Sequence, residues 1–276
     1  MTGTLYVVAT PLGNLGDLSP RAADTLRAVA VVAAEDTRRT RPLLSHVGAH
    51  ARLLSYHAHS APSKAEAILA LLAEGTDVAL VTDAGTPTVS DPGAALIAAA
   101  RARAISVVIV PGPSAVTAAL SGSGLSADRY TFLGFLPRKG PERAARLAEI
   151  ASSPVTVVAF EAANRLVALL EDLARSADPA RTAVVAREMT KVHEEFRTGT
   201  LEQLAGYYAS HEPRGEVTVL IAAAVPAAPP QPDDQAIRAA AVRLLEAGAS
   251  RRDAARQLTE TFGISRNAAY QLVASL

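Results

Sequence analysis

The chain has 276 residues, of which 49% are hydrophobic and only 4% aromatic, so its cores are expected to consist of Ala, Val and Leu. The 27 basic and 27 acidic side chains cancel, so the net charge gives no general attraction to nucleic acid, and any such binding must come from local patches. The absence of cysteine excludes disulfides, thiolate metal sites and a cysteine nucleophile.

The start of the chain and its hydropathy favour a soluble, cytoplasmic protein. Met1 is followed almost at once by a strand-like run, without the basic and apolar regions of a secretory signal. No stretch of about 18 consecutive apolar residues is present, so we expect no membrane span.

Residues 1–112 are predicted to form an N-terminal α/β domain. Short β-branched runs alternate there with Ala- and Leu-rich stretches, a pattern typical of a largely parallel sheet covered by helices. The expected strands are 5–9, 31–34, 78–82 and 106–110, and the expected helices include 20–29, 63–74 and 93–103. Ser19 fits an N-cap, with Pro20 at the first helical position.

Residues 113–224 are predicted to form a second α/β domain. Helices are expected from 113 to 120, after Pro141, and from 164 to 175, with strands at 130–135 and 155–160. Three further strands, 182–187, 193–198 and 216–223, follow with little helix between them, so we expect antiparallel pairing.

The end of the chain is predicted to be a separate helical domain. Residues 225–233 form a proline-rich, extended linker. Residues 234–276 contain three short helical stretches, 234–247, 251–262 and 266–274, in a pattern typical of a helix-turn-helix. The predicted fold class is therefore α/β, with two α/β lobes and a small C-terminal helical domain.

Five junctions rich in Gly and Pro directly follow strand-like runs; they are residues 10–14, 83–87, 90–93, 111–115 and 134–137. In open α/β sheets, ligands bind beyond the carboxyl ends of the strands, where glycine permits close backbone approach. One such junction would be read equally well as a tight turn, but the set predicts a nucleotide-like cofactor. No Walker A motif is present, and Gly122–Ala127, which matches GxGxxA, follows a helix and is expected to be its C-cap.

The junctions 83–87, 90–93 and 111–115 together resemble the tetrapyrrole methylase superfamily. The resemblance implies S-adenosylmethionine bound in a cleft between two α/β domains, and a homodimer. Residues 8–17, 34–38, 55–57, 132–137 and 187–195 are similar to the branch that methylates the 2′-hydroxyl of a cytidine in 16S rRNA of the small ribosomal subunit. The resemblance runs from about Thr4 to Ala222, whereas precorrin methylases share only the cofactor junctions.

The resemblance also implies which residues line the cofactor cleft. They are Pro11, Asp83, Gly85, Thr86, Ser114, Ala115 and Thr218, with Phe160 and Ala186 near the adenine. Two departures from the family pattern exclude a carboxylate role at position 58 and an imidazole role at position 164. Ala58 stands where the family usually has Glu, and Asn164 where it usually has His.

Several side chains are candidates for accepting the proton of the hydroxyl; they are His57, Lys191, His193, the pair Glu194 and Glu195, and the nearby Glu188. If residues 188–195 are extended, Lys191, His193 and Glu195 share one face and converge on the cleft. A charged strand face in water is the alternative. His57 and His59 lack carboxylate or cysteine partners, so we expect an RNA-facing loop and no metal.

Two basic clusters are expected to contact RNA phosphates: Arg38, Arg39 and Arg41, and then Arg138 and Lys139 together with Arg143 and Arg146. Solvated helix faces are the alternative. The tail from Gln235 to Leu276 has six Arg against three acids, and is expected either to contact RNA or to cap a dimer. Two competing functions are a precorrin-type methyltransferase and a nucleic-acid-binding regulator, although a regulator leaves the five junctions unexplained.

Overall fold

The computed structural model describes residues 2–224 and 234–276. They divide into two compact units, Met1–Ala224 and Val225–Leu276, each described here by itself. The predicted linker, residues 225–233, lies outside the described residues. The predicted boundary between two α/β domains at residue 112 stays a prediction, although the first unit does contain two separate sheets.

The first sheet is fully parallel, as predicted, with the strand order β3-β2-β4-β1-β5. Its strands are β1 (Thr4–Val8), β2 (Val31–Ala34), β3 (Arg52–Ser55), β4 (Val78–Val81) and β5 (Ser106–Val110). The central strands β2 and β4 are buried along their whole length because helices cover both faces, which explains their unbroken apolar sequences. Edge strand β3 was not predicted.

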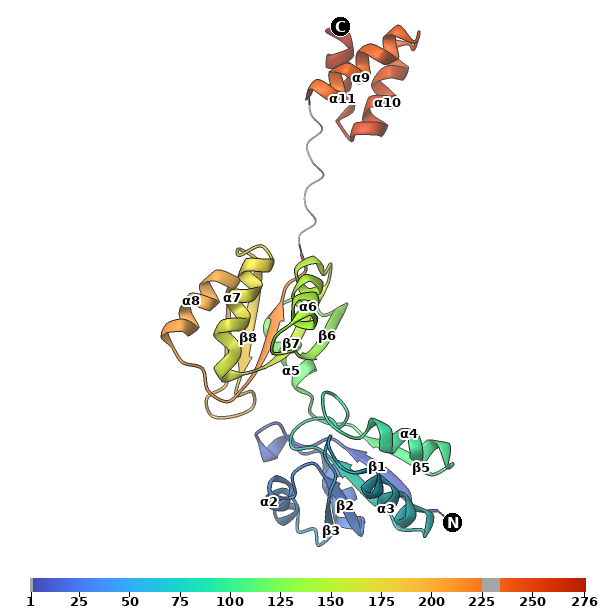
Figure 1. Ribbon diagram of the computed structural model, residues 1–276, viewed down its shortest axis with the longest axis vertical. Coiled ribbons are helices and arrows are strands. Elements are labelled where there is room, and N and C mark those ends of the chain that lie inside the picture. Colours follow the sequence, from blue (N-terminus) through green and yellow to red (C-terminus); the bar gives the residue numbers. More distant parts are fainter. Residues whose placement is uncertain (1, 225–233) are drawn as a thin grey trace. The chain divides into compact units, whose positions relative to one another are not determined.

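Helices on the two faces of this sheet complete the layers (Figure 1). They are α1 (Pro20–Ala28) and α2 (Thr37–Val47) on one face, and α3 (Pro62–Ala73) and α4 (Ala94–Ala102) on the other. Ser19 caps α1 by accepting a hydrogen bond from the Ala22 N–H at 3.1 Å, as predicted. Helix α2, which the sequence did not predict, is capped by Asp36.

The second sheet has the order β6-β7-β10-β8-β9. Its strands are β6 (Tyr130–Phe135), β7 (Thr156–Ala162), β8 (Thr182–Arg187), β9 (Glu195–Thr200) and β10 (Glu216–Ile221). Strands β6 and β7 are parallel and all other pairs are antiparallel, which confirms the predicted antiparallel pairing.

Alternate residues of the second sheet face two different helical layers. Helix α5 (Ala115–Ser123) covers one face. Helices α6 (Pro141–Ser152), α7 (Leu166–Ser176) and α8 (Leu201–Ser210) cover the other. The expectation of little helix between the last three strands was wrong, because α8 separates β9 from β10. Helix α5 ends at Gly124 in the left-handed conformation, so the GxGxxA sequence is a helix C-cap, as predicted.

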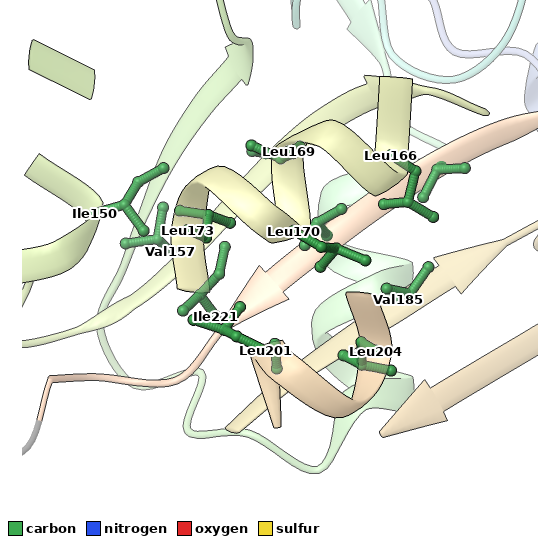
Figure 2. Close-up of a cluster of buried hydrophobic side chains, with 14 of the residues drawn as sticks. Ile150, Val157, Leu166, Leu169, Leu170, Leu173, Val185, Leu201, Leu204 and Ile221 are labelled. Carbon is green, nitrogen blue, oxygen red and sulfur yellow. The ribbon is translucent and has the colours of Figure 1, made fainter. Parts of the chain in front are cut away.

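The largest apolar cluster lies under α7. Its side chains Leu166, Leu169, Leu170 and Leu173 follow the helical repeat and are fully buried. Figure 2 shows them in one buried cluster with Leu201 and Leu204 of α8 and the sheet residues Val185 and Ile221. This packing fixes the strand ends that carry the second half of the site described below.

The second unit consists of α9 (Asp234–Glu246), α10 (Arg251–Phe262) and α11 (Arg266–Ala274), close to the predicted spans. Ser250 and Ser265 cap the last two helices, and Gly263 ends α10 in the left-handed conformation. Its small core includes Ile237, Leu258 and Val273. No helix in the described parts of the chain has the length and apolar character needed to cross a membrane.

Candidate active site

A cavity of about 350 Å³ lies within the first unit, where loops of both sheets meet. The loop after β4, residues 83–91, contributes most of one wall, together with Leu12 and the start of α5. The opposite wall comes from the ends of β6 and β7, the loop after β8, and residues 215–218 at the start of β10. The cavity therefore lies at the carboxyl ends of the first sheet's parallel strands, where the junction motifs predicted a ligand site.

The loops of the first wall are joined to one another by hydrogen bonds. Thr10 and Gly85 exchange two backbone bonds, from the Thr10 N–H to the Gly85 carbonyl at 2.8 Å and from the Gly85 N–H to the Thr10 carbonyl at 3.0 Å. The Thr86 hydroxyl donates to the Pro113 carbonyl at 2.9 Å. The loops after β1, β4 and β5 are thus fixed in one arrangement.

Gly85 is required by its conformation and its surroundings. Its φ is +84°, and a Cβ added to it would lie 3.2 Å from Leu12 Cδ2 and 3.7 Å from the Pro113 carbonyl oxygen. A side chain here would both strain the backbone and fill the cavity wall.

We expect Gly85→Ala to lower the free energy of unfolding by about 1–2 kcal/mol, because an L-residue disfavours this left-handed conformation. Urea denaturation followed by circular dichroism measures the change. Gly206→Ala in α8 is the matched control, since its Cβ would meet nothing within 4 Å and alanine favours a helix by about 1 kcal/mol. Equal stability of Gly85→Ala and the wild type would contradict this account.

Acidic side chains are concentrated around the loop after β4. Asp83 Oδ1 accepts the Asp36 N–H at 3.0 Å, and Asp83 Oδ2 lies 3.5 Å from Arg39 Nε. Burial raises the pKa of Asp83. Burial, followed by the nearby charges of Glu35, Asp83 and Glu216, raises the pKa of Asp91 to about 6. In the described part of the chain, no group of three or more His, Asp or Glu side chains is arranged to hold a metal ion.

Most of the residues predicted to bind the cofactor line this cavity; they are Asp83, Gly85, Thr86, Ser114, Ala115, Phe160 and Thr218. Pro11 lines an adjoining cavity of about 200 Å³ that shares Leu12 and Asp83 with the larger one. Ala186 is fully buried in β8 opposite Thr218, in the apolar cluster against which Phe160 packs, so its contact with the cavity is indirect.

The predicted extended conformation of residues 188–195 was wrong. The Lys191 N–H donates to the Glu188 carbonyl at 3.0 Å and the Glu194 N–H to the Lys191 carbonyl at 3.1 Å, so the segment forms consecutive turns. The expected shared face of Lys191, His193 and Glu195 is therefore absent in this described segment. Lys191 lines the cavity, whereas His193 is exposed outside it.

Glu195 and His57 also lie away from both cavities. Glu195 begins β9, where hydrogen bonds from Arg187 and Arg197 outweigh the effect of burial and lower the pKa of its carboxyl. This side chain is therefore held as an anion by two guanidinium groups. His57 follows the edge strand β3, and its backbone N–H donates to the Ser60 hydroxyl at 2.8 Å.

The basic residues predicted to bind RNA are exposed, apart from Arg143. Arg38, Arg39 and Arg41 lie on α2, and Arg138 and Lys139 on the loop after β6. Arg38 pairs with Asp36 at 2.7 Å, and Arg39 lines the smaller cavity. The neighbouring Arg143 instead has a structural role, because it is mostly buried and donates to Asp172 and to the Pro137 carbonyl.

Sequence reasoning gave no role to several residues that line the larger cavity, among them Leu12, Asp91, Phe135, Met189 and Glu216. Leu12, Asp91 and Phe135 stand in three of the five junctions, so the position of a junction after a strand was a usable signal. Phe135 and Glu216 end or begin strands at the same edge. Their placement depends on the strand order of the second sheet, which a sequence alone does not reveal.

The family sequence model of the tetrapyrrole (corrin/porphyrin) methylases matches residues 4–205. The chain belongs to this family. The methylase fold, the family and methyl transfer as the class of reaction, all predicted from the sequence, are thereby confirmed.

Relatives of this methylase match most or nearly all of its length. It is 43% identical to the ribosomal RNA small subunit methyltransferase I of Synechocystis sp. over 98% of this chain and 97% of the relative. The protein of the same name from Escherichia coli O157:H7 is 41% identical, over 98% and 94% respectively. The one from Xylella fastidiosa strain Temecula1 is 51% identical, over 79% and 81%.

Solved structures share the fold of this methylase at low sequence identity. A cobalt precorrin-4 methyltransferase is 18% identical with a TM-score of 0.62, over 79% of this chain and 94% of that one. A diphthine synthase is 17% identical with a TM-score of 0.63, over 80% and 90%. These similarities support the two-sheet α/β fold and carry no statement about substrate.

Proposed function

We propose that this methylase transfers a methyl group from S-adenosylmethionine to the 2′-hydroxyl of a cytidine in 16S rRNA of the small ribosomal subunit. The observation that carries the proposal is near-full-length similarity, at 41–43% identity, to relatives named ribosomal RNA small subunit methyltransferase I. A cobalt precorrin-4 methyltransferase shares the fold at only 18% identity, so a precorrin-type substrate is not favoured. A regulator that only binds nucleic acid would leave the cavity without a use.

The residues of the larger cavity fit S-adenosylmethionine. Phe160 and Met189 offer apolar surface for an adenine, and Gly85 lets a ligand approach the backbone. Ser114 is the N-cap of α5 and makes no capping hydrogen bond with its side chain within the described residues, so this helix start is suited to a carboxylate. Asp83 and Asp91 add negative charge for a cationic ligand.

When bound, S-adenosylmethionine supplies a methyl group that is already activated on a sulfonium. The protein then has to hold the ribose oxygen in line and to accept a proton, and positioning contributes much of the rate. Of the side chains proposed for catalysis from the sequence, Lys191 and Glu188 line the cavity. We assign the Lys191 ammonium to hydrogen-bond the acceptor oxygen while the proton of the hydroxyl passes to water, whereas His57, His193 and Glu195 have no proposed contact with that oxygen.

The acceptor side is proposed to include the exposed basic groups on α2 and on the loop after β6; they are Arg38, Arg39, Arg41, Arg138 and Lys139. These side chains would hold RNA phosphates through charge, which positions the strand without reading its sequence. We also propose that the protein acts in the cytoplasm as a homodimer, the assembly that the family resemblance implies.

The test uses the purified chain with S-adenosylmethionine carrying a labelled methyl group. We expect label in a 2′-O-methylcytidine after incubation with naked small-subunit rRNA or with assembled subunits, and mass spectrometry of digested RNA identifies the nucleoside. A strain lacking the gene should lose the same modification. Its persistence in that strain would overturn the proposal, and calorimetric titration of S-adenosylmethionine tests cofactor binding separately.

A further inference from the structure

Lys191 connects loops that belong to the two different sheets. It comes from the loop after β8, in the second sheet, and its aliphatic stem lies directly on Gly13, in the loop after β1 of the first sheet. A Cβ added to Gly13 would overlap Lys191 Cγ and lie 2.7 Å from Lys191 Cε. Real Cβ atoms essentially never approach so closely, so this lysine position depends on the glycine.

The same stem lies at the boundary between the two cavities. Lys191 lines the larger cavity, and Gly13 lines the smaller one. Leu12 and Asp83 line both. A group that moves at this boundary would change the connection between the cofactor side and the neighbouring pocket.

Glu188 holds the ammonium of Lys191. Its Oε1 lies 3.1 Å from Lys191 Nζ, and it is the one partner of that ammonium within the described residues. The carboxylate itself rests on Gly215, where a Cβ would lie 2.5 Å from Glu188 Cδ. Each member of this ion pair thus packs against a glycine from a different loop.

The backbone between the two side chains is strained. Glu188 has a φ of +49° and Thr190 a φ of +66°, both in a region that side chains with a Cβ disfavour. The Thr190 hydroxyl is buried and has no hydrogen-bond partner among the described residues. The Glu194 carboxylate stabilises the turn by accepting the Thr190 N–H at 2.5 Å. Such strain persists where a surrounding structure, often a functional site, imposes it.

We propose that Glu188 is a positioning residue that, together with Gly13, fixes Lys191 across the boundary of the two cavities for methyl transfer. The proposal rests on the proposed function for its reaction, and on the packing alone for its geometry. Glu188 occupies one N–H of the ammonium, which leaves the other two for oxygen atoms of the acceptor nucleotide. Shortening the lysine, displacing it from Gly13 or removing its carboxylate should therefore cause the same defect.

The geometry is tested without any substrate by a double-mutant cycle of thermal stability. Gly13→Ala is expected to lower Tm by about 2–4 °C in the wild-type background, because the new methyl displaces Lys191. In the Lys191→Ala background it should leave Tm unchanged, since the clashing stem is gone. Gly206→Ala, whose Cβ meets nothing, should have the same effect in both backgrounds. Equal losses from Gly13→Ala in both backgrounds would overturn the proposed contact.

The function of the pair is tested by kinetics with small-subunit rRNA. Lys191→Met and Glu188→Gln are each expected to lower kcat, with a loss of about 100-fold for a misplaced catalytic group, while the calorimetric Kd for S-adenosylmethionine changes less than about threefold. The double variant should be no slower than Lys191→Met, and Glu188→Asp should recover part of kcat. Lys64→Met, on α3, is the matched control and should keep the wild-type kcat. Losses that multiply in the double variant would contradict the positioning role.

The two proposals fail in different ways. If the wild-type chain does not methylate small-subunit rRNA, the proposed function is wrong, while the stability cycle still decides whether Lys191 depends on Gly13. If the wild type is active and Glu188→Gln keeps its full kcat, the function stands and the role of Glu188 is refuted.

Discussion

Replacement of Arg181 by methionine is expected to lower the free energy of unfolding by about 3–5 kcal/mol, because several buried carbonyls lose a charged donor. Arg181 is 93% buried, and burial lowers the pKa of its guanidinium group, which nonetheless stays charged. The guanidinium donates to the carbonyls of Ala222 at 2.6 Å, Ile150 at 2.7 Å and Ala151 at 3.0 Å. Methionine fills similar space but removes these donors, at about 1–3 kcal/mol for each buried group left unpaired; the Ile150 carbonyl keeps the Ser153 N–H at 3.2 Å.

Urea denaturation followed by circular dichroism measures the effect of Arg181→Met. Arg175→Met is the control, because Arg175 is mostly exposed and its ion pair with Asp172 is expected to contribute at most about 1 kcal/mol. A loss below about 1 kcal/mol in Arg181→Met would mean that water or a rearranged backbone replaces the guanidinium. The expected loss follows from the position of Arg181, which joins the end of α6 to the segment after β10.

The second large effect concerns Asp91, where a stabilising substitution is expected. Burial raises its pKa from 3.8 to about 6, so the folded protein binds this proton more tightly than the unfolded chain does. The free energy of unfolding therefore falls as the pH rises from about 4 to about 6, and the whole penalty is present at pH 7.5. Asp91→Asn removes the charge and should be more stable than the wild type by about 1–2 kcal/mol at pH 7.5.

Measurements at pH 4.5 and pH 7.5 separate this explanation from others. The advantage of Asp91→Asn should shrink to about a third at the lower pH, where the carboxyl of the folded protein is protonated and that of the unfolded chain is already partly ionised. Asp24→Asn, in an exposed pair with Arg27, is the control and should change stability by less than about 1 kcal/mol at either pH. The same substitution at Asp91 should weaken binding of the cationic S-adenosylmethionine. A gain in stability that is independent of pH would show that the charge is not its cause.

The sequence predicted those parts of the fold that depend on local patterns. The buried strands β2 and β4 are unbroken apolar runs, and the start of α1 is given by Ser19 and Pro20. A Gly- and Pro-containing junction after a buried strand predicted a ligand site at residues 83–87, and the family resemblance implied Asp83, Gly85 and Thr86 as its lining.

Features that depend on tertiary contacts were missed. The side chains from Glu188 to Glu194 could be read as alternating between two faces of a strand. Glu188 and Thr190 instead adopt left-handed conformations, which these residue types do not predict. Glu195 was predicted to face the cleft, but Arg187 and Arg197 bind it on the sheet. Nothing local distinguishes Arg181 from a surface arginine, because its partners lie about 30 and 40 residues away.

The hydrogen bonds that join Thr10 to Gly85 and Thr86 to Pro113 make the two walls of the cavity unequal. One wall is complete before any ligand arrives, so a cofactor that binds there orders little additional backbone. The opposite wall comes from several segments of the second sheet, and the turn between β8 and β9 contributes Glu188, Met189 and Lys191. In evolutionary terms, substitutions in this turn would affect the acceptor through Lys191 and the methyl donor through Met189, while the first wall could stay unchanged.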